Sequence, residues 1–107
     1  MKKIALLADG WKRLITYAWI RGINAFNENH SEPIEICHYN CMGNWSNDPV
    51  FNQGEYNIFT LPELDRYDGI IIDINTMKDT AQRHHLIEIV KKSGVPAISL
   101  GNFAEGL

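Results

Sequence analysis

Four short polar segments carry the residues that could do chemistry in this chain. Asp9, Trp11 and Arg13 surround the break in "LLADGWKR", and Trp45 lies in "MGNWSNDP". Asn75 and Asn102 follow two later apolar runs. Aromatic rings cover the apolar faces of a ligand, while carboxylates, amides and a guanidinium bind its hydroxyl or anionic groups. This set of residue types favours binding of a polar small molecule such as a sugar.

The same segments argue against several other chemistries. The first one has a single glycine, Gly10, whereas dinucleotide and P-loop sites need several spaced glycines, so we expect no nucleotide cofactor. Cys37, His38 and Cys41 match no standard zinc spacing, and on a strand the two cysteines would lie roughly 13 Å apart. That separation is too large for a disulfide, and both cysteines are expected to be small buried residues.

The segments that contain Trp11 and Trp45 could also have a purely structural role. Trp11 could stack on a ligand or cover the start of a helix. The polar residues around Trp45 are also residues that favour turns. No Ser/His/Asp or Cys/His set converges on one place in the sequence, so we expect a protein that is not an enzyme.

The elements that must position these segments alternate between strand and helix. The apolar patterns predict strands at Lys3–Ala8, Ile34–Asn40, Tyr67–Asn75 and Val95–Gly101. They predict helices over Lys12–Asn29, from Asp48-Pro49 to about Pro62, and from Asp79 or Thr80 to Gly94.

This alternation predicts an α/β fold, a three-layer α/β/α sandwich around a parallel sheet of about four strands. Ligands of such sheets bind beyond the carboxyl ends of the strands. That rule selects four loops: Asp9 to Arg13, Asn40 to Asp48, Asn75 to Asp79, and Gly101 to Glu105.

Composition limits the class of protein. The chain has 107 residues, 45% hydrophobic and 21% charged, and a net charge of -3. These values are typical of one globular domain and give no reason to expect a nucleic-acid surface. No apolar run is long enough to cross a membrane, and the start "MKKIALLADG" is too short in its apolar part for a signal peptide. We therefore expect a cytoplasmic protein.

Several phrases of the chain resemble a known family. They are "KIALLAD", "AWIRGINAFNE", "NQGEYNIF" with Glu55, "LPELDRYDGIIID" and "LIEIVKKSGVPAISLGN". Together they resemble the amino-terminal lobe of the type I periplasmic-binding-protein-like domain of LacI/GalR-type regulators and sugar-binding proteins. The Asp-Gly at the start of the third strand and the Gly-Val-Pro at the entry to the fourth carry the resemblance best. "GNW" and "DGWKR" look closer to sensor domains of this fold fused to diguanylate cyclase (GGDEF) modules.

The resemblance implies a function and a domain organisation. Residues 1–107 would form a single lobe, a piece of a longer two-lobe domain that holds a sugar-like or nucleoside-like ligand between its lobes. Ligand binding would then signal to a DNA-binding or GGDEF output module. The regulators commonly begin the first helix with an Asn-Pro-aromatic-aromatic run, and Arg13 and the three residues after it lack these types, so Trp11 and Tyr17 flank that position instead.

Two alternatives remain open from the sequence. "IIIDINTM" resembles the third strand of phosphorylated receiver domains, so Asp73 could accept a phosphoryl group with Asp9 as its acidic partner. Receiver domains, however, need two adjacent acids after the first strand and a lysine after a fifth. A homodimer through the helices is also expected, with Tyr17, Trp19 or the His84–His85 pair at its interface.

Overall fold

The computed structural model describes residues 1–10, 14–41 and 46–101 of the chain, with side chains from residue 17 onward in the first helix. The strands are β1 (Lys2–Asp9), β2 (Ile34–Cys41), β3 (Gly69–Asp73) and β4 (Ala97–Leu100), and the helices are α1 (Leu14–Asn29), α2 (Pro49–Tyr56) and α3 (Thr80–Ser93). Three short 3-10 turns cover Asn57–Thr60, Leu64–Arg66 and Ile74–Thr76.

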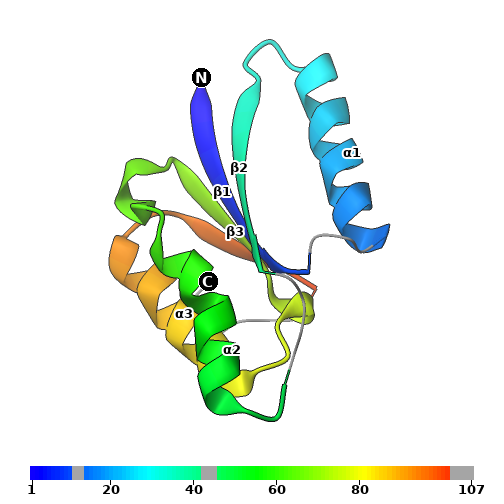
Figure 1. The fold of residues 1–107 in the computed structure, drawn as a ribbon. Coiled ribbons are helices and arrows are strands. Elements are labelled where there is room, and N and C mark those ends of the chain that lie inside the picture. The colour runs from blue at the N-terminus through cyan, green and yellow to red at the C-terminus, as the bar shows by residue number, and fades with distance from the viewer. Residues whose placement is uncertain (11–13, 42–45, 102–107) are drawn as a thin grey trace.

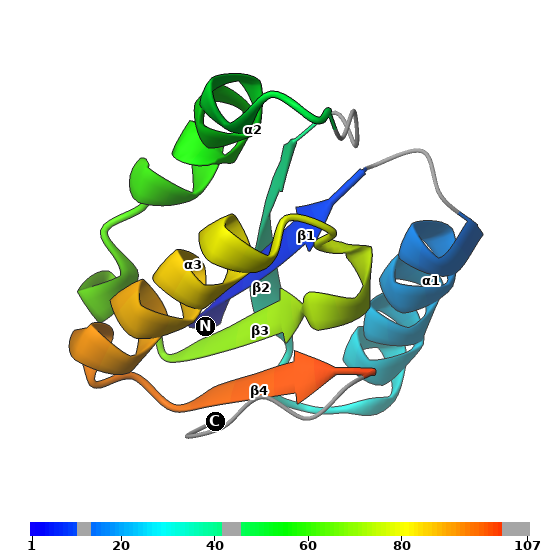
Figure 2. The same cartoon turned by 90° about the horizontal axis from the view of Figure 1, so that it is seen from below.

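The four strands form one parallel sheet in the order β2-β1-β3-β4. Helix α1 covers one face of the sheet, and α2 and α3 cover the other (Figures 1 and 2). The predicted α/β/α sandwich around a four-stranded parallel sheet is therefore confirmed, and its architecture is Rossmann-like. Below, the two sides of the sheet are called the α1 face and the α2–α3 face.

The predicted helix boundaries are confirmed where capping residues define them. Asp48 caps α2 by accepting a hydrogen bond from the Val50 N–H, with Pro49 in the first turn. Asp79 caps α3 through the Gln82 N–H, and Gly94 ends it with a φ of 72°, a left-handed conformation that glycine adopts without strain.

Several predicted strand boundaries differ from the structure by one or two residues, and the ends of α2 and β3 differ as follows. Helix α2 ends at Tyr56, and the chain reaches Pro62 through the 3-10 turn Asn57–Thr60. Strand β3 ends at Asp73 rather than Asn75, because Ile74–Thr76 turns away from the sheet. Both differences lie at element ends, where local sequence preferences define the boundary weakly.

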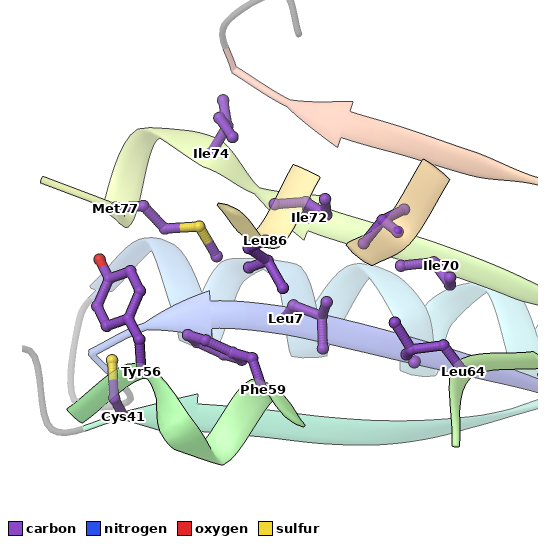
Figure 3. Packing of buried hydrophobic residues seen from close by; sticks show 12 residues of the cluster. Leu7, Cys41, Tyr56, Phe59, Leu64, Ile70, Ile72, Ile74, Met77 and Leu86 are labelled. Carbon is purple, nitrogen blue, oxygen red and sulfur yellow. The ribbon is translucent and has the colours of Figure 1, made fainter. Parts of the chain in front are cut away.

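The hydrophobic core lies on the α2–α3 face (Figure 3). Leu7 of β1 and the β3 residues Ile70 and Ile72 pack there against Phe59 and Leu86. The three successive isoleucines of β3 are not all buried, because side chains alternate between the faces of a strand. Ile71 points to the α1 face and is only half-buried.

The α1 face is less completely covered. No side chain between Tyr17 and Asn29 is fully buried, and Ile98 of β4 is 55% exposed. Ile23 of α1 lies over Leu6, and the two residues line shallow hollows on both sides of the helix. Within the described part of the chain, no helix is long and apolar enough to span a membrane.

Candidate functional site

The candidate site is the edge of the sheet formed by the carboxyl ends of the strands. Of the six residues that the sequence nominates, the structure describes Asp9, at the end of β1, and Asn75, in the turn after β3. The other four, Trp11, Arg13, Trp45 and Asn102, lie outside the described residues.

Asp9 is buried and both of its carboxylate oxygens accept hydrogen bonds. Its side chain is 4% exposed. The Cys41 thiol donates to Oδ1 over 2.8 Å, and the Tyr56 hydroxyl donates to Oδ2 over 2.7 Å. Figure 3 shows Cys41 and Tyr56 beside each other at this end of the core. Asp9 therefore joins β1 to β2 and α2, and its carboxylate is already bound within the protein.

This environment alters the chemistry of Tyr56. Burial, the hydrogen bond to Asp9 and the charge of that carboxylate together raise the pKa of Tyr56 well above its ordinary value. The hydroxyl therefore stays protonated and acts as a donor to Asp9 at every physiological pH.

Thr76 connects the ends of the two central strands. Its hydroxyl oxygen accepts the Asp9 backbone N–H over 2.8 Å, and the same hydroxyl donates to the Asp73 carbonyl over 2.7 Å. Thr76 is 3% exposed, so these bonds satisfy groups that water does not reach. The threonine thus holds the turn after β3 against the end of β1.

Asn75 is the described candidate whose polar side chain faces solvent. It is exposed, and its carboxamide makes no hydrogen bond with the described residues. The amide lies against the Cα of Gly101, just after β4, so closely that a Cβ at position 101 would overlap it. Asn75 therefore stands where the loops after β3 and β4 meet, and among the described residues its amide has no hydrogen-bond partner there.

Asp73 faces the other side of the sheet. It is 2% exposed, and the Trp19 indole N–H of α1 donates to its Oδ2 over 2.7 Å. Trp19 therefore anchors α1 to the end of β3, and its polar atom is used inside the fold.

His38 lies on the same face as Asp73 and is half-buried. Burial lowers its pKa, and the negative charge of Asp73 partly opposes that effect. Asn40, two residues further along β2, donates its amide to the His38 ring over 2.9 Å. The amide oxygen of Asn40 is buried and has no hydrogen-bond partner among the described residues.

A second polar cluster supports the loop before α2. The Asn52 side chain is 4% exposed, accepts the Ser46 N–H over 3.0 Å, and donates to the Ser46 carbonyl and to Asp79 Oδ2. Asn52 therefore links the chain just after the Trp45 position to the start of α3. Asn52 is a site residue that the sequence prediction lacks, although its place one helical turn before the aromatic Tyr56 is a usable signal.

The structure also places the cysteines and the expected dimer residues that the sequence singles out. Cys41 is buried as predicted, but Cys37 is only partly buried. Tyr17, His84 and His85 are exposed on their helices. In the described ranges no group of three or more His, Cys, Asp or Glu side chains could hold a metal ion.

The described residues of this edge offer hydrogen-bonding groups. In the described part of this edge, no serine or cysteine is hydrogen-bonded to a histidine, and both strand-end carboxylates are already bound. Comparison with protein-family models finds no family that matches the chain. Comparison with curated proteins finds no matching relative.

Proposed function

We propose that this chain is the ligand-sensing lobe of a bacterial regulator of the LacI/GalR type. It would bind a sugar-like or nucleoside-like molecule at the carboxyl edge of its sheet and would signal to a DNA-binding or GGDEF module. It would be cytoplasmic and would not itself be an enzyme.

The strand order is the observation that carries this proposal. In the order β2-β1-β3-β4 the chain changes direction across the sheet between β1 and β3. Open parallel sheets bind ligands beyond that change of direction. β3 is one of the two strands at this change of direction, and the turn after it carries the solvent-facing amide of Asn75, on the side of the loop after β4.

The proposed contacts follow from residue chemistry. Asn75 would exchange hydrogen bonds with ligand hydroxyls, while Asp9 would act indirectly by holding the end of β1 in place. Trp11 and Trp45 would cover the apolar faces of the ligand, and Arg13 and Asn102 would bind its polar groups. A ligand that also contacts a second lobe would favour the closed arrangement and so change the output.

Calorimetric titration tests the proposal with D-galactose, D-ribose and adenosine as ligands. We expect at least one of them to bind saturably, and Asn75→Ala to weaken that binding about fivefold through loss of one or two neutral hydrogen bonds. Asn24→Ala, an exposed asparagine of α1, is the matched control and should leave the affinity unchanged. Absence of saturable binding to all three, or equal binding by Asn75→Ala, would reject the proposal.

We also propose a homodimer formed through the helices. Tyr17 and Phe26 of α1 are 44% and 40% exposed, and large apolar groups at a surface favour association. Light scattering should show a mass that doubles with concentration, and Phe26→Asp should shift this transition to higher concentration. A constant monomer mass at every concentration would exclude the dimer.

A further inference from the structure

A groove of about 290 Å³ lies between α2, with the turn that follows it, and α3. It is separate from the carboxyl edge discussed above. Its floor is formed by Tyr56, Phe59 and Leu86, which are 7%, 1% and 3% exposed. The two aromatic rings meet edge to face with their centres 5.3 Å apart (Figure 3). The floor of the groove is therefore aromatic and aliphatic in character.

Polar side chains line both walls of the groove, and Ile89 is the one apolar residue among the wall residues. Gln53 and Asn57 lie on one wall, four residues apart, and Gln82 and His85 lie on the other, three residues apart. Such spacings bring side chains onto the same side of a helix. Within the described part of the chain, none of these four side chains makes a hydrogen bond to the protein.

Asn52 of the same helix provides a contrast. Its carboxamide makes three hydrogen bonds inside the fold, two to Ser46 and one to Asp79. Gln53 and Asn57 have the same functional group and use it for no internal bond. Each carboxamide can both donate and accept, so the facing walls match a ligand that has a donor next to an acceptor.

Charge and size narrow the ligand class. The residues that line the groove include no Asp, Glu, Lys or Arg. A charged ligand would lose hydration here without gaining an opposite charge. The volume lies near the lower limit of about 300 Å³ for ligand pockets, which suits one or two rings. We propose that this groove is a second binding site, for a small uncharged heteroaromatic molecule that carries a carboxamide.

This proposal does not depend on the proposed sensing function, because it uses a different set of residues. The two sites have one connection. Tyr56 forms part of the groove floor, and its hydroxyl donates to Asp9 at the end of β1. A ligand in the groove would therefore contact a residue that positions the carboxyl edge.

Titration of ¹⁵N-labelled protein with nicotinamide, followed by NMR, tests the proposal. Nicotinamide is uncharged and carries a carboxamide on a heteroaromatic ring, and nicotinate, its anionic counterpart, is the matched control ligand. We expect saturable shifts of the side-chain amides of Gln53, Asn57 and Gln82. Nicotinate should bind about tenfold more weakly, because its carboxylate cannot donate a hydrogen bond.

Two variants outside the buried core separate binding from folding. Gln82→Ala should weaken nicotinamide binding about tenfold, and Asn24→Ala, on the opposite face of the sheet, should leave it unchanged. Shifts that do not saturate, equal affinity for nicotinate, or unchanged affinity in Gln82→Ala would overturn the proposal. Shifts at Asn75 in place of the groove residues would also overturn it, while leaving the function proposed for the carboxyl edge intact.

Discussion

Asp9 and Asp73 end neighbouring strands, yet their carboxylates point to opposite faces of the sheet. Asp9 shares its face with Ala5 and Leu7 and accepts a hydrogen bond from Tyr56 of α2. Asp73 follows Ile71 on the α1 face and accepts a hydrogen bond from Trp19 of α1. Each acid therefore fastens a different helix to the sheet.

This arrangement bears on the alternative of a phosphoryl-accepting Asp73. A receiver-like site needs a second acid beside the acceptor, and Asp9 lies across the sheet from it. Asp73 is also 2% exposed, which keeps its carboxylate away from a phosphoryl donor in solvent. No observation in the described residues favours that function, so the sensing lobe is the function we propose.

Thr76→Val should destabilise the fold although the two side chains have nearly the same shape. The change leaves the buried N–H of Asp9 without its acceptor, a loss of about 1–3 kcal/mol. Urea unfolding measures the free energy of unfolding, and hydrogen exchange at the Asp9 amide should accelerate. Thr76→Ser keeps the hydroxyl and loses only a buried methyl group, so it should cost less than Thr76→Val. Equal losses would show that the hydroxyl bridge contributes no more than that methyl group.

Trp19→Phe should cost about 1–3 kcal/mol of unfolding free energy, because it removes the N–H that the buried Asp73 carboxylate accepts. Tyr17→Phe changes an exposed aromatic side chain of the same helix and should stay within about 0.5 kcal/mol of wild type. Chemical denaturation compares the two variants. If they unfold at the same denaturant concentration, the bond between Trp19 and Asp73 does not stabilise α1 on the sheet.

The order of strands and helices was predictable because its signals are local. The isoleucines Ile70 to Ile72, the Asp48-Pro49 pair and Gly94 each define an element through the conformational preferences of a few neighbouring residues. The bonds at the candidate site are not local. Cys41 and Tyr56 lie 32 and 47 residues from Asp9 in the sequence, so their contacts depend on how the strands and helices pack.

The role of individual site residues was correspondingly harder to predict. The sequence placed Asp9 correctly at the end of β1, but only the three-dimensional arrangement shows that Tyr56 and Cys41 already bind its carboxylate. Thr76 lay next to the selected Asn75 and was passed over, because nothing in its local sequence indicates a bond to a residue 67 positions away.

Tyr56→Phe should change the dependence of stability on alkaline pH. The pKa of Tyr56 is raised in the folded protein, so above about pH 10 the unfolded chain loses a proton that the folded chain keeps. The stabilisation from this hydroxyl is complete below that pH and is lost as pH rises toward the folded pKa. In this range the wild type should lose up to about 1.4 kcal/mol per pH unit more than Tyr56→Phe.

The measurement is urea unfolding of both proteins at neutral pH and at several pH values above 10. At neutral pH, Tyr56→Phe should be about 1–3 kcal/mol less stable, because Asp9 loses one of its two donors. This difference in the free energy of unfolding between the two proteins should narrow as pH rises. A difference that stays constant or widens would contradict the raised pKa of Tyr56.

Two glycine-to-alanine changes should shift stability in opposite directions. Gly101 has a φ of 88°, and a Cβ there would overlap the Asn75 amide, so Gly101→Ala should destabilise the fold by at least about 1–2 kcal/mol. Gly54 lies inside α2 with nothing within 4 Å of an added Cβ, so Gly54→Ala should stabilise it by about 0.5–1 kcal/mol. Thermal unfolding of the two variants measures whether each change raises or lowers the stability.

Gly101→Ala should destabilise the fold for two reasons, the overlap with the Asn75 amide and the backbone strain at position 101. Adding Asn75→Ala to Gly101→Ala separates these two causes. Removal of the amide relieves the overlap but leaves the backbone strain, so the double variant should recover part of the lost stability and remain below wild type. No recovery would mean that the loops after β3 and β4 do not meet at Asn75 and Gly101. That result would remove the contact which places the Asn75 amide between these two loops at the carboxyl edge.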